Sequence, residues 1–176
     1  MTTRHMKALT EVGNHEIGNL NSLKVKTVAH GAIVVGADVD NFTLVELGYN
    51  AEGERTCKQL SDVAKKSYLI ATPEDRYLGE QLVDFYNGVG DRARIVVLEA
   101  AYTRFDSSAF VLDATAPKVT NGQKAHWDVA AKKFRIHDGS HVDYATASAK
   151  FEVVSNEDDL EYTNGKEQVR FEVIEA

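Results

Sequence analysis

The chain has 176 residues, of which 43% are hydrophobic and 27% charged, enough for one domain with a sizeable core or for one domain plus a small lobe. Its formal net charge is -7, and its basic residues are scattered, with the densest group at Lys132, Lys133 and Arg135. Nucleic-acid binding requires clustered positive charge to neutralise phosphates, so the composition disfavours a nucleic-acid partner.

The cysteine content and the lengths of the apolar runs indicate in which cellular compartment the protein is made. Cys57 is the only cysteine, which excludes an intrachain disulfide and a cysteine-based zinc site. Residues 1–9 lack the apolar stretch of a secretory signal, and no run of about 18 apolar residues would span a membrane. We therefore expect synthesis in a cytoplasm and no membrane partner.

The first 22 residues are polar and weakly patterned, with interruptions such as Gly13, Gly18 and Asn21. Such a segment is either a flexible terminus or an arm that becomes ordered against a partner. We interpret 1–22 as an extended N-terminal arm. We expect a β-barrel-like body with a helix over 23–112 and a hairpin-rich β lobe over 113–176, although both could belong to one domain.

Short β-branched segments fill the first part of the body. Runs at 31–36 and 42–47 flank an Asp/Asn turn, which predicts a hairpin. We expect further strands at 55–60, 67–71, 93–98 and 109–112. Ile95 to Leu98 is continuously apolar, which indicates a strand buried on both faces.

One helix is expected, over about residues 73–86. Thr72 is a good N-cap, Pro73 suits the first helical position, and Asn87–Gly88 is a natural stop. The last third of the chain is typical of hairpins, with turn signals at Asn121–Gly122 and Asn164–Gly165.

Further strands in this last third are expected at 125–129, 133–137, 146–154 and 169–173, and no internal repeat is visible. The predicted fold is therefore mainly β, with a β-barrel- or sandwich-like body, one short α-helix and a C-terminal hairpin-rich β lobe.

Histidine and acidic residues gather at 137–143, with His126 upstream. Imidazole and carboxylate together can bind zinc, but this spacing matches no metal motif, and a polar turn between two strands explains the group. We therefore predict no metal and no cofactor.

Catalytic signals are similarly weak. Cys57 has no histidine nearby in the sequence and is predicted to be a small buried hydrophobe. The carboxylate pair Glu74–Asp75 suits a helix N-terminus, and 157–159 suits a solvated turn. We therefore predict no catalytic residue and no enzymatic activity.

Several segments together resemble the head decoration, or cement, proteins of tailed bacteriophages of Gram-positive hosts. They are Gly-Ala-Ile-Val-Val-Gly-Ala-Asp-Val-Asp-Asn at 31–41, the Thr-Leu-Val-Glu-Leu strand that follows, Tyr-Leu-Ile-Ala-Thr-Pro-Glu at 68–74, Asp-Phe-Tyr-Asn at 84–87 and Gly-Asp-Arg-Ala-Arg at 90–94. The resemblance covers about residues 20–112.

The resemblance implies a non-enzymatic virion protein on the capsid exterior, made in the bacterial cytoplasm. Such a protein binds the outer surface of an icosahedral capsid, stabilises contacts between major capsid subunits and self-associates as a homo-oligomer. We expect the arm to supply partner contacts through Arg4, His5, Lys7, Leu9, Val12, Ile17 and Leu20.

Two other functions remain open. One is another phage structural module, in a tail tube or baseplate. The other is a carbohydrate-binding β-sandwich that would use the region of Trp127 and Tyr144.

Overall fold

A computed structural model describes residues 15–74 and 81–176 of the chain. These residues are mainly β, with three single 3-10 turns, η1 (Leu82–Asp84), η2 (Val142–Ala145) and η3 (Glu157–Asp159). The predicted fold class is confirmed. None of the described helical segments is long and apolar enough to cross a membrane.

The smaller of two sheets has the strand order β6-β2-β4-β3-β5-β7. Its strands are β2 (Ala32–Val34), β3 (Thr43–Tyr49), β4 (Arg55–Gln59), β5 (Tyr68–Ile70), β6 (Arg92–Ala93) and β7 (Ile95–Val96). Only Arg94 separates the two edge strands β6 and β7, so the sheet curls until its edges meet. Apolar side chains from all six strands fill the inside of this small barrel, among them Val34, Val45, Cys57 and Ile95.

The larger sheet has the order β1-β8-β14-β12-β10-β11-β9, and β13 pairs with β14. Its strands are β1 (Gly18–Leu20), β8 (Arg104–Ser107), β9 (Phe110–Leu112), β10 (Lys124–Asp128), β11 (Lys133–His137), β12 (Lys150–Val153), β13 (Glu161–Thr163) and β14 (Lys166–Glu175).

Curling of the larger sheet is evident from its aromatic core. The ring centroids of Phe105 on β8 and Phe134 on β11 are 5.4 Å apart, although three strands lie between β8 and β11 in the sheet order. Strand spacing in a flat sheet would place these two strands about 19 Å apart. The sheet is therefore rolled around Phe105, Phe134, Phe151 and Phe171, which are all fully buried.

Both barrels have the same connectivity. The smaller barrel has five successive strands: β2, β3, β4, β5 and the bent β6–β7 segment. The larger barrel has the corresponding five: the bent β8–β9 segment, β10, β11, β12 and β14. In each, the first strand pairs parallel with the third, the second lies between the third and fourth, and the fifth returns antiparallel to the first. The sequence shows no repeat, so this repetition exists only at the level of strand order.

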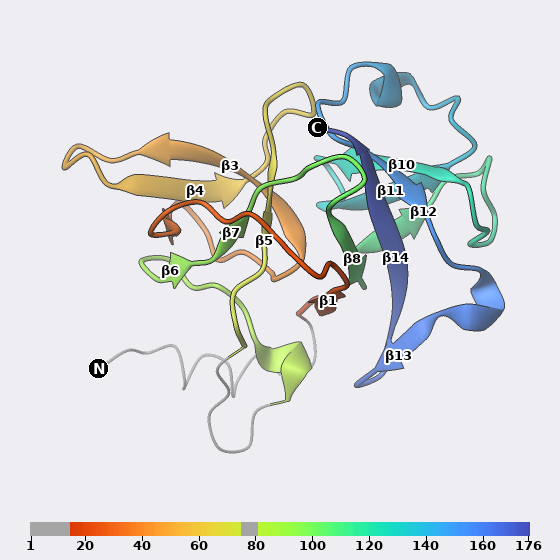
Figure 1. Ribbon diagram of the computed structural model, residues 1–176, viewed down its shortest axis with the longest axis horizontal. Helices are drawn as coiled ribbons and strands as arrows, with labels where there is room; N and C mark the ends of the chain where they lie inside the picture. Colours follow the sequence, from red (N-terminus) through yellow and green to blue (C-terminus); the bar gives the residue numbers. More distant parts are fainter. Residues whose placement is uncertain (1–14, 75–80) are drawn as a thin grey trace.

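The two barrels pack against each other, as Figure 1 shows with the smaller sheet in orange to green and the larger mainly in dark green to blue, apart from β1 in red. Adjacent residues on β3, β5 and β7 alternate between the two cores: Val45, Ile70 and Ile95 face into the small barrel, whereas Leu44, Leu69 and Val96 join the large one. This alternation explains why Ile95 and Val96 are both 0% exposed. The predicted burial on both faces is confirmed for Ile95 and Val96, whereas Val97 is half-buried and lies beyond the strand.

The predicted hairpin between 31–36 and 42–47 is wrong. β2 pairs with β4 and β6, and β3 pairs with β4 and β5. The connection between β2 and β3 is instead tied to the segment before β6 by a bridge between Val39 and Asn87. Closing the barrel therefore outweighs the local turn signal.

The α-helix expected over 73–86 is also corrected in its described part; residues 75–80 lie outside the described residues. Pro73 and Glu74 are not helical, and η1 is a single 3-10 turn that ends at Phe85 in extended backbone (φ -79°, ψ 134°). Val83, Phe85 and Tyr86 are all buried, so the chain leaves the turn extended to fill the core and to reach Val39.

Turn signals in the last third have mixed outcomes. Asn164–Gly165 joins β13 to β14, and 129–132 joins β10 to β11, so these two hairpins are confirmed. Asn121–Gly122 forms a turn, but it does not join two paired strands, because β10 pairs with β11 and β12. The division after residue 112 stays a prediction; β8 and β9 before it share a sheet with β10 to β14 after it.

Candidate functional site

Five of the seven predicted partner-contact residues, Arg4, His5, Lys7, Leu9 and Val12, lie outside the described residues. The other two, Ile17 and Leu20, are part of the body. Ile17 is only 2% exposed, and Leu20 packs partly against the large core. Neither side chain is fully available on the surface, so contact through the arm stays a prediction for its earlier residues.

The described end of the arm is attached firmly to the large barrel. β1 adds to the edge of β8, with Gly18 opposite Ser107 and Leu20 opposite Phe105. Just before β1, the Glu16 carboxylate accepts a hydrogen bond from Ser108 Oγ (2.6 Å) and pairs with Lys133 (2.9 Å) and Lys166 (3.2 Å). Burial raises the pKa of Glu16, but these three partners outweigh it and leave the pKa below its ordinary value.

An exposed hollow with a mixed polar and apolar lining lies where the arm meets the body. It is lined by Leu23 and Tyr102, which are 105% and 69% exposed, and by Arg104 and Glu172. The Asn21 amide and the Ser22 hydroxyl donate to the Arg104 carbonyl oxygen, and the Arg104 amide donates back to Ser22 Oγ; these bonds hold the loop in place while Leu23 stays in solvent. Exposed apolar side chains grouped in a hollow with a charged rim are typical of protein contact sites.

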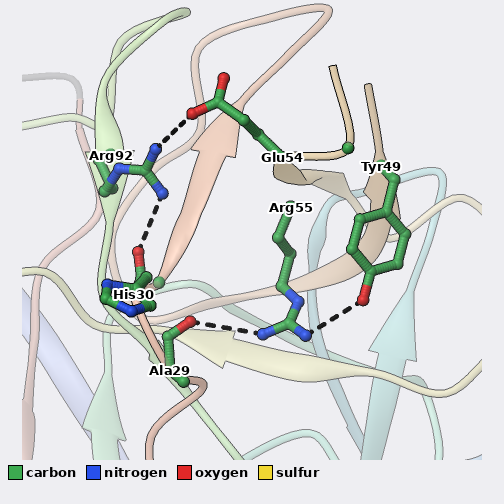
Figure 2. A pocket seen from close by; sticks show the side chains of 8 residues that line it. Ala29, His30, Tyr49, Glu54, Arg55 and Arg92 are labelled. Carbon is green, nitrogen blue, oxygen red and sulfur yellow. Dashed lines mark hydrogen bonds and ion pairs between the residues drawn. The ribbon is translucent and has the colours of Figure 1, made fainter. Parts of the chain in front are cut away.

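Figure 2 shows a second hollow, at one end of the small barrel. Its two guanidinium groups suggest an anion site, yet both already form hydrogen bonds or an ion pair with other groups of the protein. Arg92 donates to the His30 carbonyl oxygen (3.1 Å) and pairs with Glu54 (3.0 Å). Arg55 donates to the Tyr49 hydroxyl (3.1 Å) and to the Ala29 carbonyl oxygen (3.4 Å). These contacts hold the 29–31 turn against β3 and β4, so we assign them a structural role.

The histidine group noted in the sequence forms a cluster on the large barrel. His126 and His137 lie on neighbouring strands β10 and β11, and both are 0% exposed. His141 and Asp143 come from the turn that follows β11. One ligand atom each from His126, His141 and Asp143 lie within 4.8 Å of one another.

Hydrogen bonds fix the proton positions in this cluster. The Gly139 amide donates to His137 Nδ1 (2.8 Å), so a neutral His137 carries its proton on Nε2 and donates it to His126 Nδ1 (3.0 Å). His126 then carries its proton on Nε2, which is buried and has no hydrogen-bond partner among the described residues. Burial, followed by the neighbouring His137 and His141, lowers the pKa of His126 to about 4, and burial also lowers the pKa of His137.

Cys57 and Trp127, which the sequence offered as a candidate nucleophile and a candidate sugar-stacking residue, are both buried. Cys57 is 1% exposed inside the small barrel, and burial raises the pKa of its thiol to about 11, which disfavours the reactive thiolate. Trp127 is 1% exposed and packs on Phe134, so it offers no face for stacking on a sugar. Trp127 therefore does not contribute to a carbohydrate site, and carbohydrate binding through the region of Tyr144 stays a prediction.

Sequence reasoning noticed the histidines but missed the Leu23 and Tyr102 hollow. These two residues are far apart in the chain and meet only because β1 pairs with β8. No local signal marks them.

The architecture defines a mainly β protein built of two small barrels. Comparison with known proteins then gives its origin: residues 11–174 match the YonC prophage protein family, and the chain belongs to it. It is 64% identical, over the full length of both chains, to the "SPbeta prophage-derived uncharacterized protein YonC" of Bacillus subtilis (strain 168). No solved structure matches the chain. The protein is thus phage-derived, as the resemblance implied.

Proposed function

We propose that the chain is a structural protein of the phage particle, which binds the outer surface of the icosahedral capsid and stabilises contacts between major capsid subunits. In this proposal it acts by binding alone, without catalysis, nucleic acid or membrane. It is made in the host cytoplasm and ends on the capsid exterior, beside further copies of itself.

The observation that carries the proposal is the exposed hollow of Leu23 and Tyr102 in a chain of phage origin. It adjoins β1, through which the N-terminal segment joins the body. A partner surface that covers the hollow would therefore also lie close to the arm. Many copies on a symmetric lattice would add weak contacts into tight attachment.

The duplicated barrel favours a second candidate, a subunit of a tail tube or baseplate. Each chain offers two bodies of the same strand order, which suits a ring in which similar surfaces recur. Such a subunit should assemble into rings or tubes when purified alone, and electron microscopy of the isolated protein distinguishes the two candidates.

Co-sedimentation with expanded capsids that lack this protein tests the first candidate. We expect the full chain to pellet with the capsids and Tyr102→Ser to lose at least about tenfold in affinity, since an exposed aromatic anchor commonly contributes more than 1 kcal/mol. Tyr162→Ser is the matched control, because Tyr162 is 68% exposed on β13, away from the hollow. Failure of the full chain to pellet, or equal loss in both variants, contradicts the proposal.

A further inference from the structure

The histidine cluster has a feature that barrel packing does not explain. His126 Nε2 is buried without a partner among the described residues, and it is the nitrogen left free by the His137 hydrogen bond. An unsatisfied buried polar atom costs free energy, so native structures retain few of them without a reason. Here the ligand atoms of His141 and Asp143 lie within 4.8 Å of His126.

We infer that His126, His141 and Asp143 bind a divalent metal ion of the zinc class. Two imidazoles and one carboxylate are a donor set that zinc accepts, with water in the fourth position. Metal–ligand distances of about 2.0–2.1 Å place tetrahedral ligand atoms about 3.3 Å apart, so donors that now lie within 4.8 Å of one another must approach by up to about 1.5 Å. The Asp143 side chain is 57% exposed, which leaves it free to move by this amount.

We assign Nδ1 as the ligand atom of His141. This atom lies 4.0 Å from Asp143 Oδ2, and the hydrogen bond that it accepts from the Asp143 amide is long, at 3.3 Å. Exchanging that weak bond for a metal contact sacrifices little. The metal would then join β10 to the η2 turn, where the His126 ring already lies 4.7 Å from that of His141.

His137 orients the His126 ring through their hydrogen bond, and this bond predicts a change at the Gly139 amide when metal binds. To bind metal through Nε2, His126 must carry its proton on Nδ1 and donate it to His137 Nε2. His137 must then carry its own proton on Nδ1, where the Gly139 amide now donates at 2.8 Å. Metal binding therefore switches both tautomers and breaks the Gly139 hydrogen bond.

Zinc titration of the untagged full-length protein, followed by calorimetry and by amide NMR, tests this inference. We expect one zinc ion per chain at micromolar concentration, a higher midpoint of thermal unfolding and a large shift of the Gly139 amide signal. His141→Ala and Asp143→Asn change only the partly exposed donors and should each weaken binding at least about tenfold.

Matched controls are His30→Asn and Asp158→Asn, which alter an exposed histidine and an exposed carboxylate elsewhere. These controls should keep wild-type affinity. Unchanged zinc affinity in His141→Ala and Asp143→Asn, absence of micromolar binding, or binding that leaves the Gly139 signal in place would each overturn the inference.

Discussion

Glu16 and Lys133 form a 2.9 Å ion pair that links the segment just before β1 to the first residue of β11. The Glu16 side chain is 11% exposed and also contacts Ser108 and Lys166. Through this carboxylate, the end of the arm is attached to three separate parts of the large barrel.

Replacing this carboxylate should therefore loosen the arm. We expect Glu16→Gln to lower the free energy of unfolding by about 1–3 kcal/mol, because two ammonium groups lose their counter-charge in a partly buried setting. Hydrogen exchange at Ile17 and Gly18 should accelerate more than at β14. Glu54→Gln is the control: its ion pair with Arg92 is about half exposed, so chemical denaturation should show a change below about 0.5 kcal/mol. Equal effects in both variants would contradict the anchoring role.

Gly18 allows β1 to approach the barrel closely. A Cβ at this position would lie 2.2 Å from the Asp106 carbonyl oxygen and 2.4 Å from Phe42 Cγ. We expect Gly18→Ala to destabilise the protein by about 1–3 kcal/mol and to displace β1 from β8. Gly48→Ala is the matched strand control, because its Cβ would meet only the Thr56 hydroxyl, at 3.2 Å. Thermal unfolding of the two variants measures the difference, and a Gly18→Ala protein as stable as Gly48→Ala would contradict the close approach.

Acid should weaken the small barrel through Glu46. Burial raises the pKa of Glu46, but hydrogen bonds from Ser61 and Lys65, and then Lys58, outweigh it and lower the pKa from 4.5 to about 2. A carboxyl group whose pKa is lower in the folded than in the unfolded protein stabilises the fold at any pH above its pKa in the unfolded protein. This stabilisation is lost as the pH falls to the pKa of the group in the folded protein. Stability should therefore decline between about pH 4.5 and pH 2.

The two lysine partners of Glu46 are about half exposed, so we expect this contribution to be about 1–2 kcal/mol. Denaturant unfolding at several pH values measures it. In Glu46→Gln, stability at pH 7 should fall by this amount, and the acid-dependent decline should become shallower. An unchanged pH profile would show that Glu46 is not paired as described.

Cys57 should be unreactive in the folded protein. Its side chain is 1% exposed, and burial raises the pKa of the thiol to about 11. A colourimetric thiol reagent at pH 8 should label Cys57 only after unfolding, since the thiolate is the reactive form. Rapid labelling of the native protein would mean that the small barrel opens.

Much of the strand content was predictable from local pattern. On β14, Val169, Phe171 and Val173 alternate with polar residues, and the strand is present with those three side chains fully buried. The pairing of β2 was not predictable in this way. Its partners β4 and β6 are distant in sequence, and barrel closure selects them over the adjacent run at 42–47.

The site was only partly predictable for the same reason. The histidines at 137 and 141 were visible as a group, but their relation to His126 depends on the register of β10 and β11. Leu23 and Tyr102 carried no signal, because an exposed apolar residue has meaning only once its spatial neighbours are known. The α-helix was over-predicted because good capping signals at Thr72 and Pro73 act locally, whereas burial of Phe85 and Tyr86 favours extended chain.

Electron cryomicroscopy of the phage particle would locate the chain directly. If the chain binds the capsid as proposed, density for the two-barrel body should lie on the outer face of the capsid shell and repeat with the shell's symmetry, with the Leu23 and Tyr102 hollow turned toward a major capsid subunit. Density for this body in the tail or baseplate instead, or a mature particle that lacks the chain altogether, would contradict the proposal.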